Sequence, residues 1–235
     1  MPGRYKILSG STLKVIALVS MTCDHLAAYL WNGTEALRRP LLSAIGFQVT
    51  GCDLMRGFGR IAFPLFAFLL TEGFRHTRDR LRYGCGLLAF AFLSEIPWNL
   101  AASGSPVYPV QNIFFTLTLG YAGICALEYL KDDRPMLLLT LAGLLALSIV
   151  SGADYGPAGF GFIILMHVLR SAPVPRALIG STMLPRTWQA GLAFIPIAMY
   201  DGRRGFIKGR ALKYAFYLYY PAHLLAIYYL KQNTI

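Results

Sequence analysis

Charged residues are scarce in this sequence. They make up 14% of its 235 residues, against about 25% in a typical soluble domain. Hydrophobic residues reach 56%, and long apolar runs recur along the whole chain. This composition excludes a soluble globular enzyme, a disordered tail and a coiled coil. An integral membrane protein is therefore expected.

Cysteine is rare as well, and the motifs of common soluble enzymes are missing. The four cysteines form no CxxC pair and no Cys/His cluster, which excludes a disulfide-stapled secreted module and gives no sign of a metal site. The sequence has no Walker loop, no GxSxG, no HExxH and no Rossmann glycine pattern after a strand. No bound metal is therefore expected.

Acidic residues are outnumbered by basic ones, 11 to 22, which gives a net charge of +11. In a chain this apolar, such an excess is typical of loops that face anionic membrane lipids, so lipids rather than nucleic acid are the expected partners. Arginines crowd into 75–82, and further basic residues occupy 201–213, whereas 102–111 has no charge and 151–157 has only Asp154. The positive-inside rule predicts that the two basic loops and the amino terminus, with Arg4 and Lys6, are cytoplasmic.

Most apolar runs are close to the roughly 20 residues that a membrane-spanning helix requires. The stretch 174–200 is interrupted by Pro175, Pro185, Arg186 and Pro196, and it is expected to be one broken span or a re-entrant pair of short helices. Nothing alternates with period two, so no strand is expected. The predicted fold is an all-α polytopic membrane helix bundle of about eight spans (7–10) in a single domain, 1–235. The predicted spans are 12–31, 57–74, 83–101, 112–130, 135–151, 157–170 and 212–231.

Asp24 and His25 are ionisable residues well inside the first predicted span. A charge at that depth costs about 2.5–3.5 kcal/mol on insertion scales, so such residues usually have a function. Eleven residues of helix return Lys14 and His25 to within about 20° of one face, roughly 16.5 Å apart along the axis. The stripe would carry a cation near one end and an imidazole deep in the membrane. A polar contact between helices is the structural alternative.

Arg60 stands near the start of the second predicted span, four residues before Pro64. Because proline has no amide hydrogen, the carbonyl of Arg60 loses its helical partner and a kink is expected there. A guanidinium beside a kink suits a pocket for phosphate or carboxylate, which arginine binds with two parallel hydrogen bonds. An arginine that extends to the membrane interface is the alternative.

Other polar residues lie near the ends of predicted spans or beside prolines. Glu72 and Glu95 are placed either to pair with a buried cation or to face solvent, and His223 lies mid-span on one face with Tyr220. Asn112 has the sequence context of a helix N-cap. His76 is predicted to be a surface residue and His167 an interfacial one.

Several motifs occur in a fixed order between about residues 11 and 230. On these motifs the chain resembles the TraX family, which includes the membrane protein that acetylates the amino terminus of conjugative F-type pilin. TraX proteins are in turn similar to a broad superfamily of transmembrane acyltransferases that share a basic residue, ten intervening residues and a histidine on the first helix. The motifs are Lys14-x10-His25 with Asp24 before the histidine, Gly59-Arg60-Ile-Ala-Phe-Pro-Leu-Phe-Ala-Phe68, Glu72-Gly-Phe-Arg-His76, Ser94-Glu95-Ile-Pro97, Asn112-Ile-Phe-Phe, Tyr155-Gly156-x-x-Gly159 and Tyr219-Tyr220-x-x-His223-Leu224.

The resemblance implies a multi-pass protein of the bacterial inner membrane that moves an acetyl group from cytoplasmic acetyl-CoA to the amine of a pilin-like protein. Such a reaction needs a base or an acyl carrier, a positive group for the developing oxyanion and a site for the CoA phosphates. His25, with Asp24 as its neighbour, and Arg60 are the expected catalytic residues. Lys14, Arg75 and Arg78 are the expected CoA-binding residues. Expected to line the acceptor side are Glu72, Glu95, Asn112, Tyr155, Tyr220 and His223.

Three other functions fit the same residues. Within the enzyme class, the acceptor could be a hydroxyl group of a surface glycan. In a proton-coupled transporter, Asp24, His25 and His223 would form a proton relay, although no inverted repeat is visible. A non-catalytic pilus assembly factor would tolerate the loss of His25.

Overall fold

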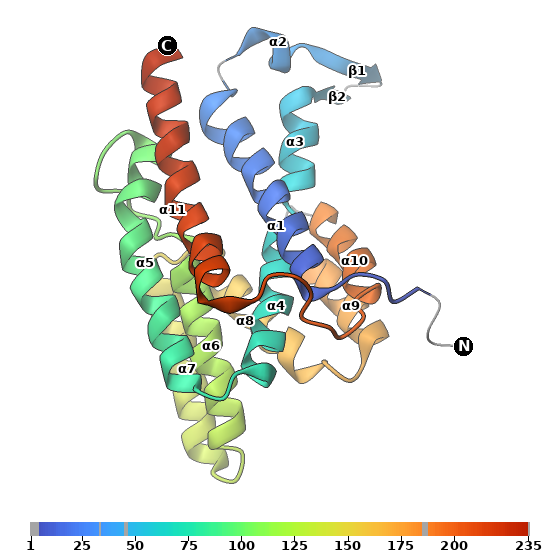
Figure 1. The fold of residues 1–235 in the computed structure, drawn as a ribbon, viewed down its shortest axis with the longest axis vertical. Helices are drawn as coiled ribbons and strands as arrows, with labels where there is room; N and C mark the ends of the chain where they lie inside the picture. Colours follow the sequence, from blue (N-terminus) through green and yellow to red (C-terminus); the bar gives the residue numbers. More distant parts are fainter. Residues whose placement is uncertain (1–4, 33, 45–46, 185–187, 235) are drawn as a thin grey trace.

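The protein is a bundle of long and short helices with one small β-hairpin (Figure 1). The computed structural model describes residues 5–32, 34–44, 47–184 and 188–234. Arg4, Pro185 and Arg186, which the sequence analysis used, lie outside these ranges. The predicted all-α class is confirmed for the bundle.

The elements follow the predicted helical runs closely. In chain order they are α1 (Gly10–His25), a π-helical turn η1 (Leu26–Leu30), α2 (Glu35–Arg38), β1 (Pro40–Ala44), β2 (Phe47–Thr50), α3 (Gly51–Gly59), α4 (Ala62–His76), α5 (Arg80–Ser103), α6 (Ile113–Tyr129), α7 (Arg134–Val150), α8 (Gly156–Val168), α9 (Pro173–Met183), a 3-10 turn η2 (Trp188–Ala193), α10 (Phe194–Ala198) and α11 (Gly209–Thr234).

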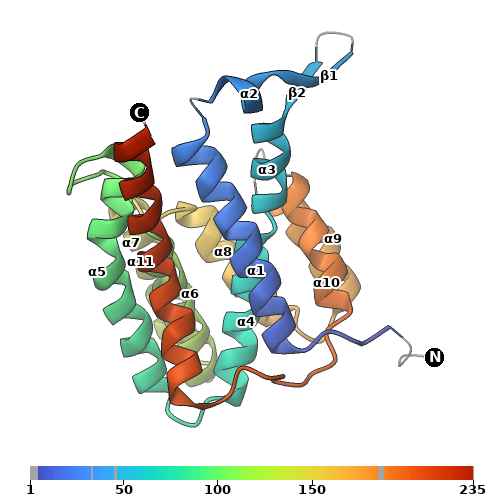
Figure 2. The same ribbon diagram turned by 45° about the horizontal axis from the view of Figure 1, so that its top comes forward.

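The helices pack in two groups around a central pair, α1 and α4 (Figures 1 and 2). One group contains α5, α6, α7 and α11, and the other contains α9 and α10. α11 lies along α5 although more than a hundred residues separate them. The core between the elements is apolar, with Leu13, Leu65, Phe74 and Phe162 almost completely buried.

Three helical stretches are long and apolar enough to cross a membrane. They are Gly10–Leu30, Gly51–His76 and Arg80–Ser103, found in a search of the described residues. Shorter apolar helices occupy Ile113–Tyr129, Arg134–Val150, Gly156–Val168 and Trp188–Ala198. The chain is therefore a membrane protein with long apolar helices, and the expected count of about eight spans is not confirmed.

The second long stretch starts earlier than the predicted 57–74 and breaks within itself. Thr50 accepts a hydrogen bond from the Asp53 amide while the Asp53 carboxylate accepts one from the Thr50 amide, so this reciprocal cap starts α3 at Gly51. α3 ends at Gly59, and α4 begins at Ala62, two residues before Pro64. The kink predicted at Arg60 is thus a complete break between two helices.

The break brings α3 against α1. A Cβ atom at Gly59 would collide with the Cα and Cβ atoms of Asp24. The hydroxyl of Ser20 donates a hydrogen bond of 2.8 Å to the carbonyl of Phe58, at the end of α3. The two helices therefore meet nearly backbone to backbone, at the level of Asp24.

The stretch 174–200 forms two short helical pieces, α9 and η2–α10, which pack against each other. Figures 1 and 2 show both pieces on the same side of the bundle. The chain then returns to the start of α1, because the amides of Ile7 and Leu8 donate to the carbonyl of Met199. Two short pieces rather than one continuous helix agree with the expectation for this stretch, and Pro185 between them lies outside the described residues.

The β-hairpin was not predicted, so the expectation of no strand was wrong. β1 and β2 pair antiparallel, with Ser43 opposite Gln48, and the register shifts between Pro40 and Leu42. The strands are only five and four residues long. A hairpin this short and irregular gives no sustained alternation for a pattern search to detect.

Candidate functional site

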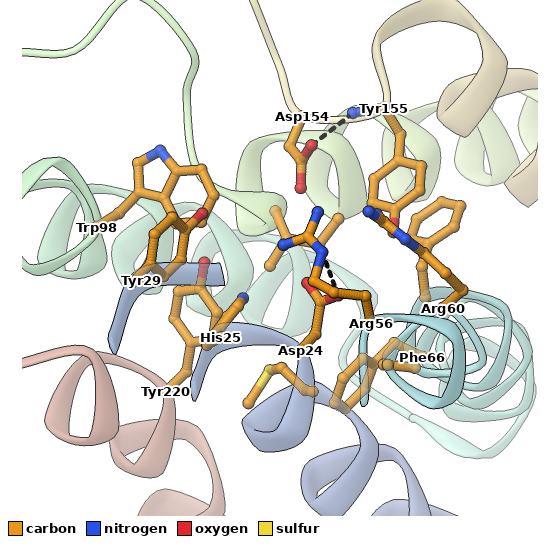
Figure 3. A pocket seen from close by; sticks show the side chains of 15 residues that line it. Asp24, His25, Tyr29, Arg56, Arg60, Phe66, Trp98, Asp154, Tyr155 and Tyr220 are labelled. Atoms are coloured by element: carbon orange, nitrogen blue, oxygen red, sulfur yellow. Dashed lines mark hydrogen bonds and ion pairs between the residues drawn. The ribbon is translucent and has the colours of Figure 1, made fainter. Parts of the chain in front are cut away.

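A small polar cavity of about 170 Å³ lies where α1, the α3–α4 break, the α7–α8 loop and α11 meet (Figure 3). We call it the histidine pocket. Its polar and aromatic lining comprises Asp24, His25, Tyr29, Arg56, Arg60, Phe63, Phe66, Trp98, Asp154, Tyr155 and Tyr220. Two carboxylates and two guanidinium groups thus face one cavity inside a membrane protein.

His25 is the last residue of α1 and is 8% exposed. Its Nδ1 atom lies 2.7 Å from Nε2 of His223, and Nδ1 of His223 lies 2.9 Å from the Tyr219 carbonyl oxygen. The ring of Tyr29 is 5.7 Å from the His25 ring, and that of Trp98 is 6.1 Å away. His25 therefore stands between a second histidine and an aromatic wall.

Asp24 faces α3 rather than His25. Its carboxylate forms an ion pair with Arg56, with 3.6 Å between Oδ1 and Nε. That distance is too long for a hydrogen bond, and the buried Oδ1 has no hydrogen-bond partner among the described residues. The attraction between the two charges lowers the cost of holding the Asp24 carboxylate in this partly buried position.

Arg60 lies in the break between α3 and α4. Figure 3 shows its guanidinium beside the side chain of Tyr155. Tyr155 has a left-handed backbone, with φ of 61°, and its ring stacks on Phe63 at 4.1 Å between centroids. The loop before α8 thus closes the pocket on the side of Arg60.

Asp154 belongs to the same loop and points toward the guanidinium of Arg56 (Figure 3). Its Oδ1 atom accepts a hydrogen bond of 3.0 Å from the Tyr155 amide. Burial raises the pKa of this carboxyl to about 6, against the lowering effects of that hydrogen bond and of Arg60. The carboxyl therefore changes its charge near neutral pH.

Two polar atoms around the histidine pocket are buried without hydrogen-bond partners in the described part of the chain. The hydroxyl of Tyr220, in a side chain 4% exposed, has no hydrogen-bond partner among the residues that the structure describes. The Asp24 oxygen is in the same state. Buried polar atoms without partners are costly, so these two oxygens are available to a polar ligand that enters the cavity.

A larger cavity of about 520 Å³ is lined in part by residues of the loops 75–82 and 201–213. Figure 2 shows these two loops at the same end of the bundle. We call this cavity the basic pocket. Its interior is apolar and aromatic, and Lys14 places its ammonium group 5.5 Å above the Phe216 ring. The cationic side chains and the histidine that line it are Lys14, His76, Arg78, Arg204 and Lys213.

The two pockets share part of their walls. Met21, Phe66, Ile113 and Tyr220 line both of them. Lys14 and His25, predicted to lie on one stripe of the first helix, open into different pockets on either side of this shared wall.

The structure divides the residues singled out in the sequence into three sets. Asp24, His25, Arg60, Tyr155 and Tyr220 line the histidine pocket, with His223 directly behind His25. Lys14, Glu72 and Arg78 line the basic pocket.

The third set lines neither pocket. Arg75 is exposed and binds Glu72 at 2.9 Å. Asn112 donates a hydrogen bond of 2.6 Å to Glu95 and caps α6 through the Phe114 amide, as its sequence context predicted.

His76 is exposed, as predicted, and His167, predicted to lie at the membrane interface, is buried between two helices. His167 is 2% exposed, and its Nε2 atom lies 2.9 Å from a carboxylate oxygen of Glu128. Glu128 reaches it from α6, a contact between helices that the sequence alone does not reveal.

Arg56, Asp154, Tyr29 and Trp98 were not singled out from the sequence. Arg56 precedes the predicted start of its span, and Asp154 falls in a stretch interpreted as a loop. The Thr50–Asp53 capping box was the available signal that α3 begins early enough to include Arg56. Within the described residues, no group of three or more His, Cys, Asp or Glu side chains is arranged to hold a metal ion.

Comparisons with known proteins identify relatives over nearly the whole chain. A family model described as TraX protein matches residues 9–231. The chain is 26% identical over 246 residues to the "Probable fimbrial assembly protein FimC, serogroup H1" of Dichelobacter nodosus, an alignment that covers 92% of this chain and 93% of that protein. No solved structure matches the chain.

Proposed function

The chain belongs to the TraX family, and from its two pockets we propose that it is a membrane-embedded acyltransferase. The donor is acyl-CoA, with acetyl-CoA the form that the family resemblance implies. The acceptor is an amine, and His25 is the group that activates it.

The observation that carries this proposal is the wall shared by the two pockets. The basic pocket offers cations to the CoA phosphates and an apolar interior to the rest of the donor. Met21 and Tyr220 line both cavities, so the two cavities adjoin, and we propose that the long pantetheine arm of CoA carries the thioester between these side chains from one to the other. The reacting carbonyl then lies beside His25, while the phosphates stay near Lys14 and Arg78.

In the reaction, the acceptor nitrogen attacks the thioester carbonyl carbon while His25 takes a proton from that nitrogen. The oxyanion that develops is stabilised by the guanidinium of Arg60, with Arg56 held nearby by Asp24. The C–S bond then breaks, and the proton on His25 passes to the CoA thiolate. The products are an amide and CoA with a free thiol.

The relative from Dichelobacter nodosus suggests where the acceptor is found. That protein is described as a fimbrial assembly protein, and a pilin-like protein with a free amine is the acceptor that we propose. From the charge of the basic loops we propose that the donor side faces the cytoplasm of a bacterium, with the protein in the inner membrane and its amino terminus inside. A cysteine introduced at Asp79 should then resist labelling from outside intact cells.

A non-catalytic pilus assembly factor is the second candidate, because the printed description of the relative names assembly and no chemistry. It differs from the first candidate in needing no donor. A charged cavity with unpartnered buried oxygens favours chemistry over assembly alone.

The test combines a cellular and a purified assay. Mass spectrometry of envelope proteins and glycans, with and without this protein, should find one protein amine that gains the mass of an acetyl group. Purified protein in lipid nanodiscs should release CoA thiol from acetyl-CoA only when an acceptor peptide is present. If a glycan hydroxyl is modified instead, the acceptor is a glycan rather than a protein amine. If neither a modification nor thiol release is found, the protein is the non-catalytic assembly factor.

A further inference from the structure

A chain of three polar groups runs from α11 to His25. The carbonyl of Tyr219 contacts Nδ1 of His223 at 2.9 Å, and Nε2 of His223 contacts Nδ1 of His25 at 2.7 Å. The two imidazole planes differ by only 4°. Both histidine side chains are 8% exposed, so water does not complete their hydrogen bonds freely.

The carbonyl at the end of this chain determines where the protons lie. A carbonyl oxygen can only accept a hydrogen bond, so Nδ1 of His223 carries a hydrogen. In a neutral imidazole the other nitrogen is then an acceptor, and Nε2 of His223 must receive its hydrogen from Nδ1 of His25. His25 is left with an unprotonated Nε2.

The neutral state of the pair follows from its surroundings. Among the described residues, no carboxylate is hydrogen-bonded to either ring, so an added proton would be buried without a compensating partner. These hydrogen positions follow from the hydrogen bonds that link the Tyr219 carbonyl, His223 and His25.

The free nitrogen faces the cavity. His25 lines the histidine pocket, whereas His223 does not, so the edge of His25 that binds His223 points away from the pocket. No hydrogen bond to Nε2 of His25 is found in the described part of the chain. This is the position that a base needs to reach an acceptor proton.

We propose that His223 is a positioning residue that holds His25 in the tautomer with Nε2 as its basic atom. The inference rests on the proposed role of His25 in acyl transfer. When Nε2 takes a proton, Nδ1–H remains bonded to Nε2 of His223, which stabilises the imidazolium that forms. The role is that of an orienting group, filled by a neutral histidine instead of a carboxylate.

The surrounding contacts fix His223 in place for this role. The ring of Tyr219 stacks on the His223 ring, with 5.1 Å between centroids and 12° between planes. The Tyr219 hydroxyl is 2.8 Å from the Thr22 hydroxyl on α1, which ties α11 to α1 one helical turn before His25. The register between the two helices thus sets the distance between the two imidazoles.

The first measurement does not depend on activity. The chain has four histidines, so single substitutions can assign the ¹⁵N resonances of all four rings in the protein held in lipid. In the wild type, Nε2 of His25 should be unprotonated and Nδ1 protonated. In His223→Ala, the His25 ring should become a mixture of both tautomers. A wild-type His25 with its hydrogen on Nε2 would overturn the proposal.

The second measurement uses kinetics with matched variants. His223→Ala should lower kcat by about 10–100-fold, the usual cost of losing a group that orients a histidine, with little change in KM for acetyl-CoA. His223→Gln places an amide oxygen that can accept from His25 Nδ1, and it should recover most of that loss. If both variants lower only yield and thermal stability, with wild-type kcat per folded molecule, His223 is merely structural. If the tautomer is as expected but wild-type protein transfers no acyl group, the proposed function fails and the assignment of the tautomer stands.

Discussion

The histidine pocket and the basic pocket share a wall, but their charged side chains are arranged differently. In the histidine pocket, Asp24 and Asp154 face Arg56 and Arg60 across a cavity of about 170 Å³. In the basic pocket, the charged side chains surround an apolar interior three times as large, of about 520 Å³, and the cationic ones include Lys14 and Lys213.

The two arrangements suit two different functions. Opposite charges fixed around a small cavity can stabilise charge that forms during a reaction, since they are already oriented before it starts. Cations around an apolar volume bind a ligand that is anionic at one end and uncharged along the rest. The following predictions test whether the histidine pocket serves the reaction and the basic pocket binds the donor, from the largest expected effect to the smallest.

His25→Ala should abolish chemistry while leaving the donor bound. We expect acyl transfer to fall by about 10²–10⁴-fold, the usual contribution of a general base, with KM for acetyl-CoA nearly unchanged. Thiol release from CoA by purified protein measures the rate. Arg134→Ala, at an exposed position that lines neither pocket, is the control. An active His25→Ala protein would end the catalytic assignment.

Gly59→Ala should damage the histidine pocket through its backbone. The new methyl group would collide with Asp24 and force α1 and α3 apart, which typically costs about 1–3 kcal/mol. We expect a lower melting temperature and weaker activity together. Gly143→Ala on α7 meets nothing within 4 Å, so it should be neutral or stabilising. Equal effects of the two variants would contradict the tight contact between α1 and α3.

Lys14→Ala should act on binding rather than on chemistry. Losing one charged contact to a phosphate is expected to raise KM for acetyl-CoA about ten-fold while kcat changes less. Lys131→Ala removes an exposed lysine that lines neither pocket and serves as the matched control. A loss confined to kcat would mean that the basic pocket takes part in the reaction itself.

Asp154→Asn should remove a pH dependence of stability. Because the folded-state pKa of about 6 lies above the ordinary value of 3.8 for an aspartate, this carboxyl favours the fold below about pH 4 and loses that contribution as the pH rises through 6. The melting temperature of the wild type should therefore fall from pH 5 to pH 7.5 by roughly 2–4 °C more than that of the variant. Asp132→Asn, at an exposed position, should behave as the wild type.

The sequence predicted the features that depend on residues close together along the chain, such as helix breaks and helix caps. Pro64 indicated the break at Arg60, the prolines of 174–200 indicated two short pieces, and Asn112 was recognised as a cap. The depth of Asp24 and His25 also singled out the part of the first helix that lines the histidine pocket, because the cost of a buried charge can be inferred from an apolar run.

The rest of the site depends on contacts between distant segments. His25 and His223 are 198 positions apart, and nothing in either segment indicates that the two rings meet. Asp154 was interpreted as a loop residue, and it is one, but its loop folds inward over Arg56. Local patterns identify which residues are unusual, whereas packing decides which of them meet.

The π-helical turn after His25 has a consequence for the spacing of residues along the first helix. In this turn the amide of Trp31 bonds to the carbonyl of Leu26, five residues earlier, so one turn contains an additional residue. Removing a single residue from Leu26–Leu30 would restore ordinary helical spacing, and the chain that follows would keep nearly its original orientation relative to His25, because the π-helical turn accommodates its extra residue within one turn. Lys14 and His25 would keep their spacing as well. The turn therefore places one more residue beside His25 without reorienting the segments on either side of it.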